Sequence, residues 1–284
     1  MPKQTIALIN PADVSLEYNQ IKIVQDEQVY LRPIEDVRCL LIDHHSVHIT
    51  IPLLNKLSES NVAVVFCNER HIPISMLLDL ESNGMQSKYI RGQLATQEPL
   101  KKRIWKQIVE RKIINQSMLL EKLGIGKDLL KIYYANVKVG DSSNREGIAA
   151  KIYWKKLFGK NFIRDRIGDV PNNFLNYGYT LLRSFTSRAI MDAGLLPLIG
   201  IFHKNYYNSF PLADDLMEPY RPFVDEKVFE LYSKKKVDID KSVKQELLQI
   251  FYDKVSYDEL LSTTRTLAGI YIGEGKVLYY PKLV

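Results

Sequence analysis

The feature that most constrains this chain is a change in hydrophobic period near residue 87. Before it, apolar and polar residues alternate in short segments rich in Val, Ile and Tyr, such as residues 16–24. Alternation with a period of two is typical of strands with one buried face. Polar turn segments separate these strands, and residues 51–60 predict one helix among them. The sequence therefore predicts a small antiparallel β domain over residues 1–86.

Beyond residue 87 the apolar positions recur with a helical period. One long segment begins at Pro99, a residue favoured at the first helical position, and ends at Gly124, a residue favoured just past a helix C-terminus. Further helices are expected at residues 128–136, 142–158, 172–194, 222–236, 238–255 and 256–273. Residues 87–284 are thus predicted to form a larger all-α domain, which makes the fold class α+β.

The composition is that of a globular protein with a moderate basic excess. Hydrophobic residues make up 46% of the chain, and the net charge of +6 permits nucleic acid, membrane-surface or acidic partners without selecting one. Cys39 and Cys67 lie in apolar segments, where buried free thiols are the ordinary outcome. The N-terminal segment has no apolar stretch typical of a signal peptide, and the longest apolar run, residues 194–202, is too short to cross a bilayer. We expect a cytoplasmic protein without a membrane partner.

Glu146 lies at the head of an otherwise apolar helical stripe. At 100° per residue it shares one face with Ala150, Tyr153 and Leu157. One interpretation is structural, because Ser143 and Glu146 have the spacing of a capping box, in which each side chain bonds the other's backbone amide. The other interpretation is that the carboxylate is a metal ligand. Its own segment does not distinguish the two.

Two later segments supply candidate partners for Glu146. In the first, His203 follows an apolar run and begins a polar, aromatic segment. In the second, Asp215 and Glu218 lie three residues apart on one helical face. Each has an alternative. His203 is compatible with a lone core or surface histidine, Asp214 or Asp215 with a helix N-cap, and Glu218 with an ion pair to Arg221. If Glu146, His203 and Glu218 met, two carboxylates and an imidazole would suit Mn²⁺ or Mg²⁺ with open positions for phosphate oxygens.

Four segments together carry a family resemblance. They are "SNREGIAAKIYWKKLFG" at 143–159, "NNFLNYGYTLLRS" at 172–184, "GLLPLIGIFH" at 194–203 and "LADDLMEPYRPFVD" at 212–225. In order and spacing they resemble the universal CRISPR-associated spacer-acquisition endonuclease and integrase, and the forms "SNREG", "YGYTLL" and "DLMEPYRP" resemble type II systems in particular.

The resemblance implies a site and a cofactor. The metal ligands would be Glu146, His203 and Glu218, with Asp215 as a supporting carboxylate and Mg²⁺ or Mn²⁺ as the metal. The N-terminal β domain would be the dimerisation domain, and the helical domain would be the catalytic, DNA-binding one.

It also implies a reaction. The enzyme would insert short foreign DNA fragments as spacers into a CRISPR array, for antiviral defence, through 3′-hydroxyl attack on repeat phosphodiesters. Its partners would be DNA, a second copy of itself and a small second adaptation protein. The type II features add an effector nuclease and an accessory adaptation protein. Two alternatives stay open on the residues alone: a metal-independent DNA-binding scaffold and a metallohydrolase of small phosphoesters.

DNA contacts are expected mostly at the phosphate backbone. Candidate basic residues are Lys101, Lys102, Arg103, Lys106, Lys151, Lys155, Lys156, Lys160, Arg164 and Arg166. Tyr177, Tyr206 and Tyr207 are candidates for stacking on unpaired bases, with core packing as the alternative for Tyr177.

Overall fold

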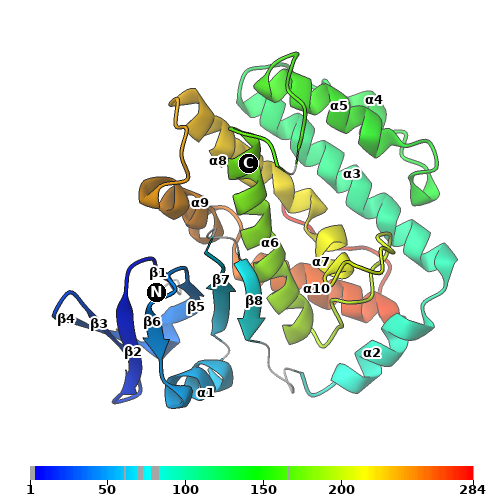
Figure 1. Cartoon of the computed structure of the whole chain (residues 1–284). Coiled ribbons are helices and arrows are strands. Elements are labelled where there is room, and N and C mark those ends of the chain that lie inside the picture. The colour runs from blue at the N-terminus through cyan, green and yellow to red at the C-terminus, as the bar shows by residue number, and fades with distance from the viewer. Residues whose placement is uncertain (1–3, 61, 70–72, 78–82, 166, 284) are drawn as a thin grey trace. The chain divides into compact units, whose positions relative to one another are not determined.

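The computed structural model describes residues 4–60, 62–69, 73–77, 83–165 and 167–283, and the chain divides into two compact units, Met1–Leu80 and Glu81–Val284 (Figure 1). Strands dominate the first unit and helices the second, so the predicted order of a β region followed by a helical region is confirmed. The predicted boundary after residue 86 lies one residue inside α2 (Gln86–Ala95).

The first unit holds two four-stranded sheets. One has the order β1 (Gln4–Leu8), β5 (Val37–Ile42), β7 (Ala63–Cys67) and β8 (Pro73–Leu77). The other has the order β4 (Gln28–Pro33), β3 (Gln20–Gln25), β2 (Ala12–Glu17) and β6 (Val47–Ile49).

The predicted antiparallel arrangement is only half right. Among the described strands, β2–β3, β3–β4 and β7–β8 are antiparallel, whereas β1–β5, β5–β7 and β2–β6 are parallel. A parallel pair needs a crossover, and α1 (Ile51–Glu59) lies in the connection from β5 to β7. Leu53 and Leu57 of this helix are fully buried in the core together with Leu40 and Val64 of those strands. The predicted helix at 51–60 is confirmed.

The second unit consists of helices. Its described elements are α2, α3 (Glu98–Lys122), α4 (Lys131–Tyr134), the 3₁₀ turn η2 (Val139–Asp141), α5 (Arg145–Phe158), α6 (Asn172–Asp192), α7 (Pro211–Leu216), the 3₁₀ turn η3 (Glu218–Tyr220), α8 (Arg221–Ser233), α9 (Lys241–Asp253) and α10 (Tyr257–Tyr271). A further 3₁₀ turn, η1 (Ile34–Asp36), lies in the first unit. No helix in the described part of the chain is long and apolar enough to cross a membrane.

Two long helices organise this unit (Figure 1). The helix α3 packs against α4, α5, α8 and η3, while α6 packs against α7, α8 and α10. Pro99 lies in the first turn of α3, and Gly124, with φ of +70°, follows its C-terminus, as the sequence predicts. The contacts of α3 with α5 and η3 bring distant parts of the chain to one place, where the candidate site lies.

Candidate active site

Glu146 stands in the first turn of α5, and other residues cap that helix. The N-cap is Asn144, whose Oδ1 accepts the Gly147 amide at 3.2 Å, and the Asp141 carboxylate accepts the amides of Arg145 and Glu146 at 2.8 and 3.0 Å. The Ser143 hydroxyl is buried without a hydrogen-bond partner. The capping-box interpretation is therefore wrong, because the amides of the first turn are already satisfied and the Glu146 side chain points to a different partner.

That partner is Lys112 of α3. Its ammonium nitrogen lies 2.6 Å from Glu146 Oε1 and 2.6 Å from Glu218 Oε2, so one cation stands between the two predicted acidic ligands. Lys112 is only 9% exposed and Glu218 only 5%. Although burial opposes the charged ammonium, Glu218 and Glu146 hold the pKa of Lys112 above its ordinary value.

Glu218 is fixed from several sides. It is the first residue of η3, and the Asn115 side chain of α3 donates to the carbonyl of the next residue, Pro219, at 2.7 Å. Arg221 contacts its Oε1 at 3.0 Å, so the predicted ion pair exists beside the Lys112 contact. Although burial works against the charged form, Arg221 and Lys112 hold the pKa of Glu218 below its ordinary value. A buried carboxylate kept ionised is ready to bind a cation.

His203 is held by Asp215. The carboxylate of Asp215 lies 2.5 Å from His203 Nδ1 and accepts the backbone amides of Ile201, Phe202 and His203 at 2.6, 2.9 and 3.3 Å. The hydrogen bond to Asp215 raises the pKa of His203, although burial works in the opposite direction. Because an ionised carboxylate only accepts, Nδ1 carries the hydrogen, and Nε2 is left as the nitrogen that could bind a metal.

The predicted residues thus occupy two adjoining groups. Glu146 and Glu218 face the same ammonium, and His203 pairs with Asp215, with an electrostatic interaction between His203 and Glu218. Within the described residues, no three His, Cys, Asp or Glu side chains lie close enough together to hold a metal ion.

The donor set nevertheless fits a divalent cation. Two carboxylates already contact one positive charge, and the imidazole beside them is oriented by a third carboxylate, as metal-binding histidines usually are. Lys112 is not among the site residues predicted from the sequence. The available signal was its place on the apolar face of α3, four residues after Ile108, where a lysine needs a buried partner.

Two buried tyrosines and Asp225 form a hydrogen-bond network next to Arg221, the residue that contacts Glu218. Tyr153 of α5 and Tyr179 of α6 both donate hydrogen bonds to the buried carboxylate of Asp225 in α8. The guanidinium of Arg221 lies 4.5 Å from the centre of the Tyr179 ring and also contacts Glu218. The network joins α5, α6 and α8 at the site.

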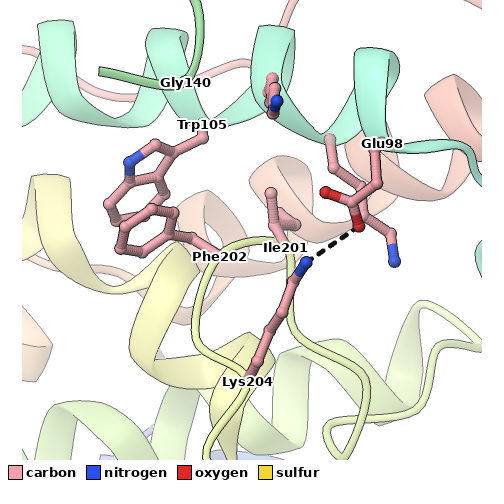
Figure 2. Close-up of a pocket in the computed structure, with 8 residues that line it drawn as sticks. Glu98, Trp105, Gly140, Ile201, Phe202 and Lys204 are labelled. Carbon is pink, nitrogen blue, oxygen red and sulfur yellow. Dashed lines mark hydrogen bonds and ion pairs between the residues drawn. The ribbon is translucent and has the colours of Figure 1, made fainter. Parts of the chain in front are cut away.

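A pocket of about 270 Å³ is lined in part by the two residues that flank His203 in the chain, Phe202 and Lys204 (Figure 2). Its walls are formed by Glu98, Lys101, Lys102, Trp105, Gly140, Ile201, Phe202 and Lys204. The rings of Trp105 and Phe202 are stacked at 4.3 Å, and the Trp105 ring lies 6.1 Å from the His203 ring. Lys204 reaches Glu98 at 3.0 Å across the pocket. Three lysines and the half-exposed ring of Phe202, next to a candidate metal ligand, suit a nucleic acid strand.

The amino-acid sequence is similar to that of known proteins. A family model described as CRISPR associated protein Cas1 matches residues 7–262. A CRISPR-associated endonuclease Cas1 of Neisseria meningitidis serogroup C is 34% identical over 262 residues, which cover 91% of this chain and 86% of the relative. A CRISPR-associated endonuclease Cas1 of Pyrobaculum aerophilum is 29% identical, with coverage of 75% and 77%.

Solved structures share the fold. A casposase bound to integration product superposes with a TM-score of 0.80 at 21% identity, covering 98% of this chain and 92% of the casposase chain. A CAS1 protein from Thermotoga maritima gives a TM-score of 0.74 at 18% identity, with coverage of 98% and 100%. A chain of a Cas6-RT-Cas1–Cas2 complex gives 0.75 at 18% identity, covering 98% of this chain and 36% of the other.

Proposed function

Because the chain belongs to the family of CRISPR-associated Cas1 proteins, we propose that it is a metal-dependent DNA endonuclease and integrase of CRISPR adaptation. It joins the 3′-hydroxyl ends of short foreign DNA fragments to phosphodiesters of the CRISPR repeat. One observation supports this proposal most directly. Glu146 and Glu218 both contact the buried ammonium group of Lys112, and His203 lies close enough to interact electrostatically with Glu218.

Each residue has a role in the proposed site. Glu146, Glu218 and His203 Nε2 would hold Mg²⁺ or Mn²⁺, which when bound polarises the target phosphate and offsets the charge that develops on its oxygens. Asp215 orients the imidazole and fixes the segment that carries it. Arg221 keeps Glu218 ionised and in place.

The lysine-lined pocket would receive the DNA strand beside the metal. Lys101, Lys102 and Lys204 would contact phosphates, and the half-exposed ring of Phe202, which stacks on the buried Trp105, would face a base or sugar.

Other side chains extend this proposed DNA surface. Lys151, Lys155 and Lys156 of α5 are exposed and share a helix with Glu146, and Tyr206 and Tyr207 are almost fully exposed. Tyr177 is buried, so its alternative as a core residue is confirmed, and Arg164 bonds Asn172 and Asn176. Arg166 lies outside the described residues.

The proposed partners follow from the family. A neighbour in the fold is a Cas6-RT-Cas1–Cas2 complex, which supports a small second adaptation protein of the Cas2 kind as a partner of this chain. A homodimer, and contact with an effector nuclease and an accessory adaptation protein, are further parts of the proposal. The DNA substrates imply a cytoplasmic location.

A strand-transfer assay tests the function. A labelled oligonucleotide with a free 3′-hydroxyl is mixed with a repeat-containing duplex, the partner protein and Mn²⁺ or Mg²⁺. Glu146→Gln, His203→Asn and Glu218→Gln should each abolish joining, as EDTA should, because residues of one metal site fail as a unit. Ser143→Ala is the matched control and should retain wild-type activity, since its hydroxyl has no partner.

The same assay separates the alternatives. A DNA-binding scaffold would bind the duplex without joining strands under any metal condition. A hydrolase of small phosphoesters would cleave an aryl phosphodiester as fast as it acts on DNA. Strand transfer that resists EDTA, or folded Glu146→Gln protein with wild-type rates, would contradict the proposed metal site.

A further inference from the structure

We propose that Lys112 is a built-in counter-cation of the metal site. Its ammonium group holds Glu146 and Glu218 together before a divalent ion binds, and it gives up its place when one does. The inference rests on the proposed function, because it requires that these two acids bind a divalent cation.

Three separate elements meet at the ammonium nitrogen. Lys112 comes from α3, Glu146 from the first turn of α5 and Glu218 from η3, and both contacts measure 2.6 Å. Two ionised carboxylates turned toward each other at a buried place repel, and a buried charge is strongly destabilising when it has no partner. Lys112 therefore keeps the acidic ligands assembled in the absence of metal.

Both carboxylates contact the same ammonium nitrogen. Glu146 Oε1 accepts a hydrogen bond from it, and the buried Glu218 Oε2 lies 2.6 Å from it. Arg221 holds the other oxygen of Glu218, Oε1, at 3.0 Å. Glu218 would therefore stay in place if Oε2 exchanged the ammonium for another cation.

The ammonium and a divalent ion bound to both oxygens would compete for the space between them. Like charges at a buried place repel strongly, and the four-carbon stem of lysine lets the ammonium withdraw. The lysine thus preserves the site but weakens its apparent affinity for metal, because the ion must first displace it.

Replacing Lys112 tests this competition. For Lys112→Met and Lys112→Gln we expect a lower melting temperature in EDTA than wild type, and recovery toward wild type at saturating Mn²⁺. The dissociation constant for Mn²⁺, measured by calorimetry without DNA, should fall by at least about fivefold, the lower end of typical coupling between two ligands.

Lys122→Met is the matched control. Lys122 lies on the same helix and contacts a buried carboxylate, that of Glu226, at 3.2 Å. The control substitution removes the same charge and should leave Mn²⁺ affinity unchanged. An unchanged or weaker Mn²⁺ affinity in the Lys112 variants, or an equal thermal loss with and without Mn²⁺, would overturn the inference.

Mn²⁺ binding by the wild-type protein distinguishes a failure of the proposed metal site from a failure of the proposed role of Lys112. If wild type binds no Mn²⁺, or if Glu146→Gln binds it equally well, the proposed metal site itself fails. If wild type binds Mn²⁺ through Glu146 but the Lys112 variants match it, only the counter-cation role fails.

If both Lys112 variants fail to fold, the displacement of Lys112 by metal can still be tested on the wild-type protein. Brief acetylation followed by peptide mass spectrometry reports how accessible each lysine is. Saturating Mg²⁺ should increase acetylation of Lys112 several-fold and leave Lys122 unchanged. A Lys112 that stays equally protected with Mg²⁺ would contradict its displacement.

Discussion

Asp215 illustrates at the residue scale how one buried carboxylate can position the segment that carries a proposed metal ligand, His203. It accepts three consecutive backbone amides and the imidazole of His203. In Asp215→Asn one acceptor becomes a donor that faces those N–H groups, so we expect a loss on the order of 3 kcal/mol in the free energy of unfolding. Mn²⁺ affinity should fall by about 10- to 100-fold, because the imidazole loses its orienting partner.

The neighbouring residue provides the control for this prediction. Asp214 is also buried in α7, but it pairs with Arg183, at 2.7 and 3.1 Å. Asp214→Asn should lower stability without changing Mn²⁺ affinity. Calorimetry and urea unfolding of both variants decide the matter, and equal loss of Mn²⁺ affinity in the two would contradict a specific role for Asp215.

The sequence predicts the acidic residues and the histidine of this site, but not the lysine between the acids. The motif segments contain Glu146, His203 and Glu218, and the structure brings Glu146 and Glu218 to one ammonium group. The segments do not reveal Lys112, which lies outside them. They also do not reveal that Asp215 binds three backbone amides, because those bonds depend on how the loop before α7 folds.

At the scale of the element, the start of α5 shows that the helix is capped by Asn144 and not by the predicted Ser143. Asn144, at φ of 49°, caps the helix, whereas Ser143 has a buried hydroxyl without a partner. Asn144→Ala should cost about 1–2 kcal/mol of unfolding free energy, through the lost cap and the left-handed backbone. Ser143→Ala should stay within about 0.5 kcal/mol of wild type in urea unfolding. Equal losses would restore the capping box.

The helices α5, α6 and α8 share a pH-sensitive junction at Asp225. Burial raises the pKa of Asp225 from its ordinary 3.8 to about 6, although hydrogen bonds from Tyr179 and Tyr153 act in the opposite direction. The folded protein therefore binds this proton more tightly than the unfolded chain. The stability that the proton contributes is fully present below about pH 4 and is lost as the pH rises through about 6.

A comparison with Asp225→Asn isolates this effect. The unfolding free energy of wild type minus that of the variant should decrease by about 3 kcal/mol between pH 4 and pH 7, since one pKa unit corresponds to about 1.4 kcal/mol. Urea unfolding at several pH values measures the difference, in which the other titrating groups largely cancel. A difference that does not change with pH would contradict the role of Asp225.

Element boundaries were easier to predict than strand partners. The ends of α3 depend on Pro99 and Gly124, which act within one helical turn, so the sequence places them within two residues. Whether β5 pairs in parallel with β7 depends on how α1 crosses between them. Alternation reveals a strand and its buried face but not the direction of its neighbour.

At the scale of the whole molecule, the proposed DNA contacts lie at the phosphate backbone, and the net charge of +6 is compatible with them. Glu146→Gln should bind duplex DNA within a few-fold of wild type, because many phosphate contacts dominate affinity. Replacing Lys151, Lys155 and Lys156 together by Gln should reduce the slope of log affinity against log salt by up to about 3. The matched triple change of Lys234, Lys235 and Lys236 should leave that slope nearly unchanged. Equal effects of the two triples would contradict a DNA surface on α5.

We expect two copies of the chain to associate. The edge strand β4 of the first unit offers a surface for this association. This strand lies at the edge of its sheet, and Val29 and Leu31 are 56% and 43% exposed on it. An open edge with apolar side chains tends to pair with another chain. We therefore expect a homodimer at micromolar concentration by light scattering, and a monomer for the double variant Val29→Glu, Leu31→Glu with an unchanged far-ultraviolet circular dichroism spectrum. Ile132→Glu, at a position 64% exposed in the second unit, should remain dimeric. A wild type that is monomeric at every accessible concentration, or a double variant that stays dimeric, would rule out dimerisation through β4.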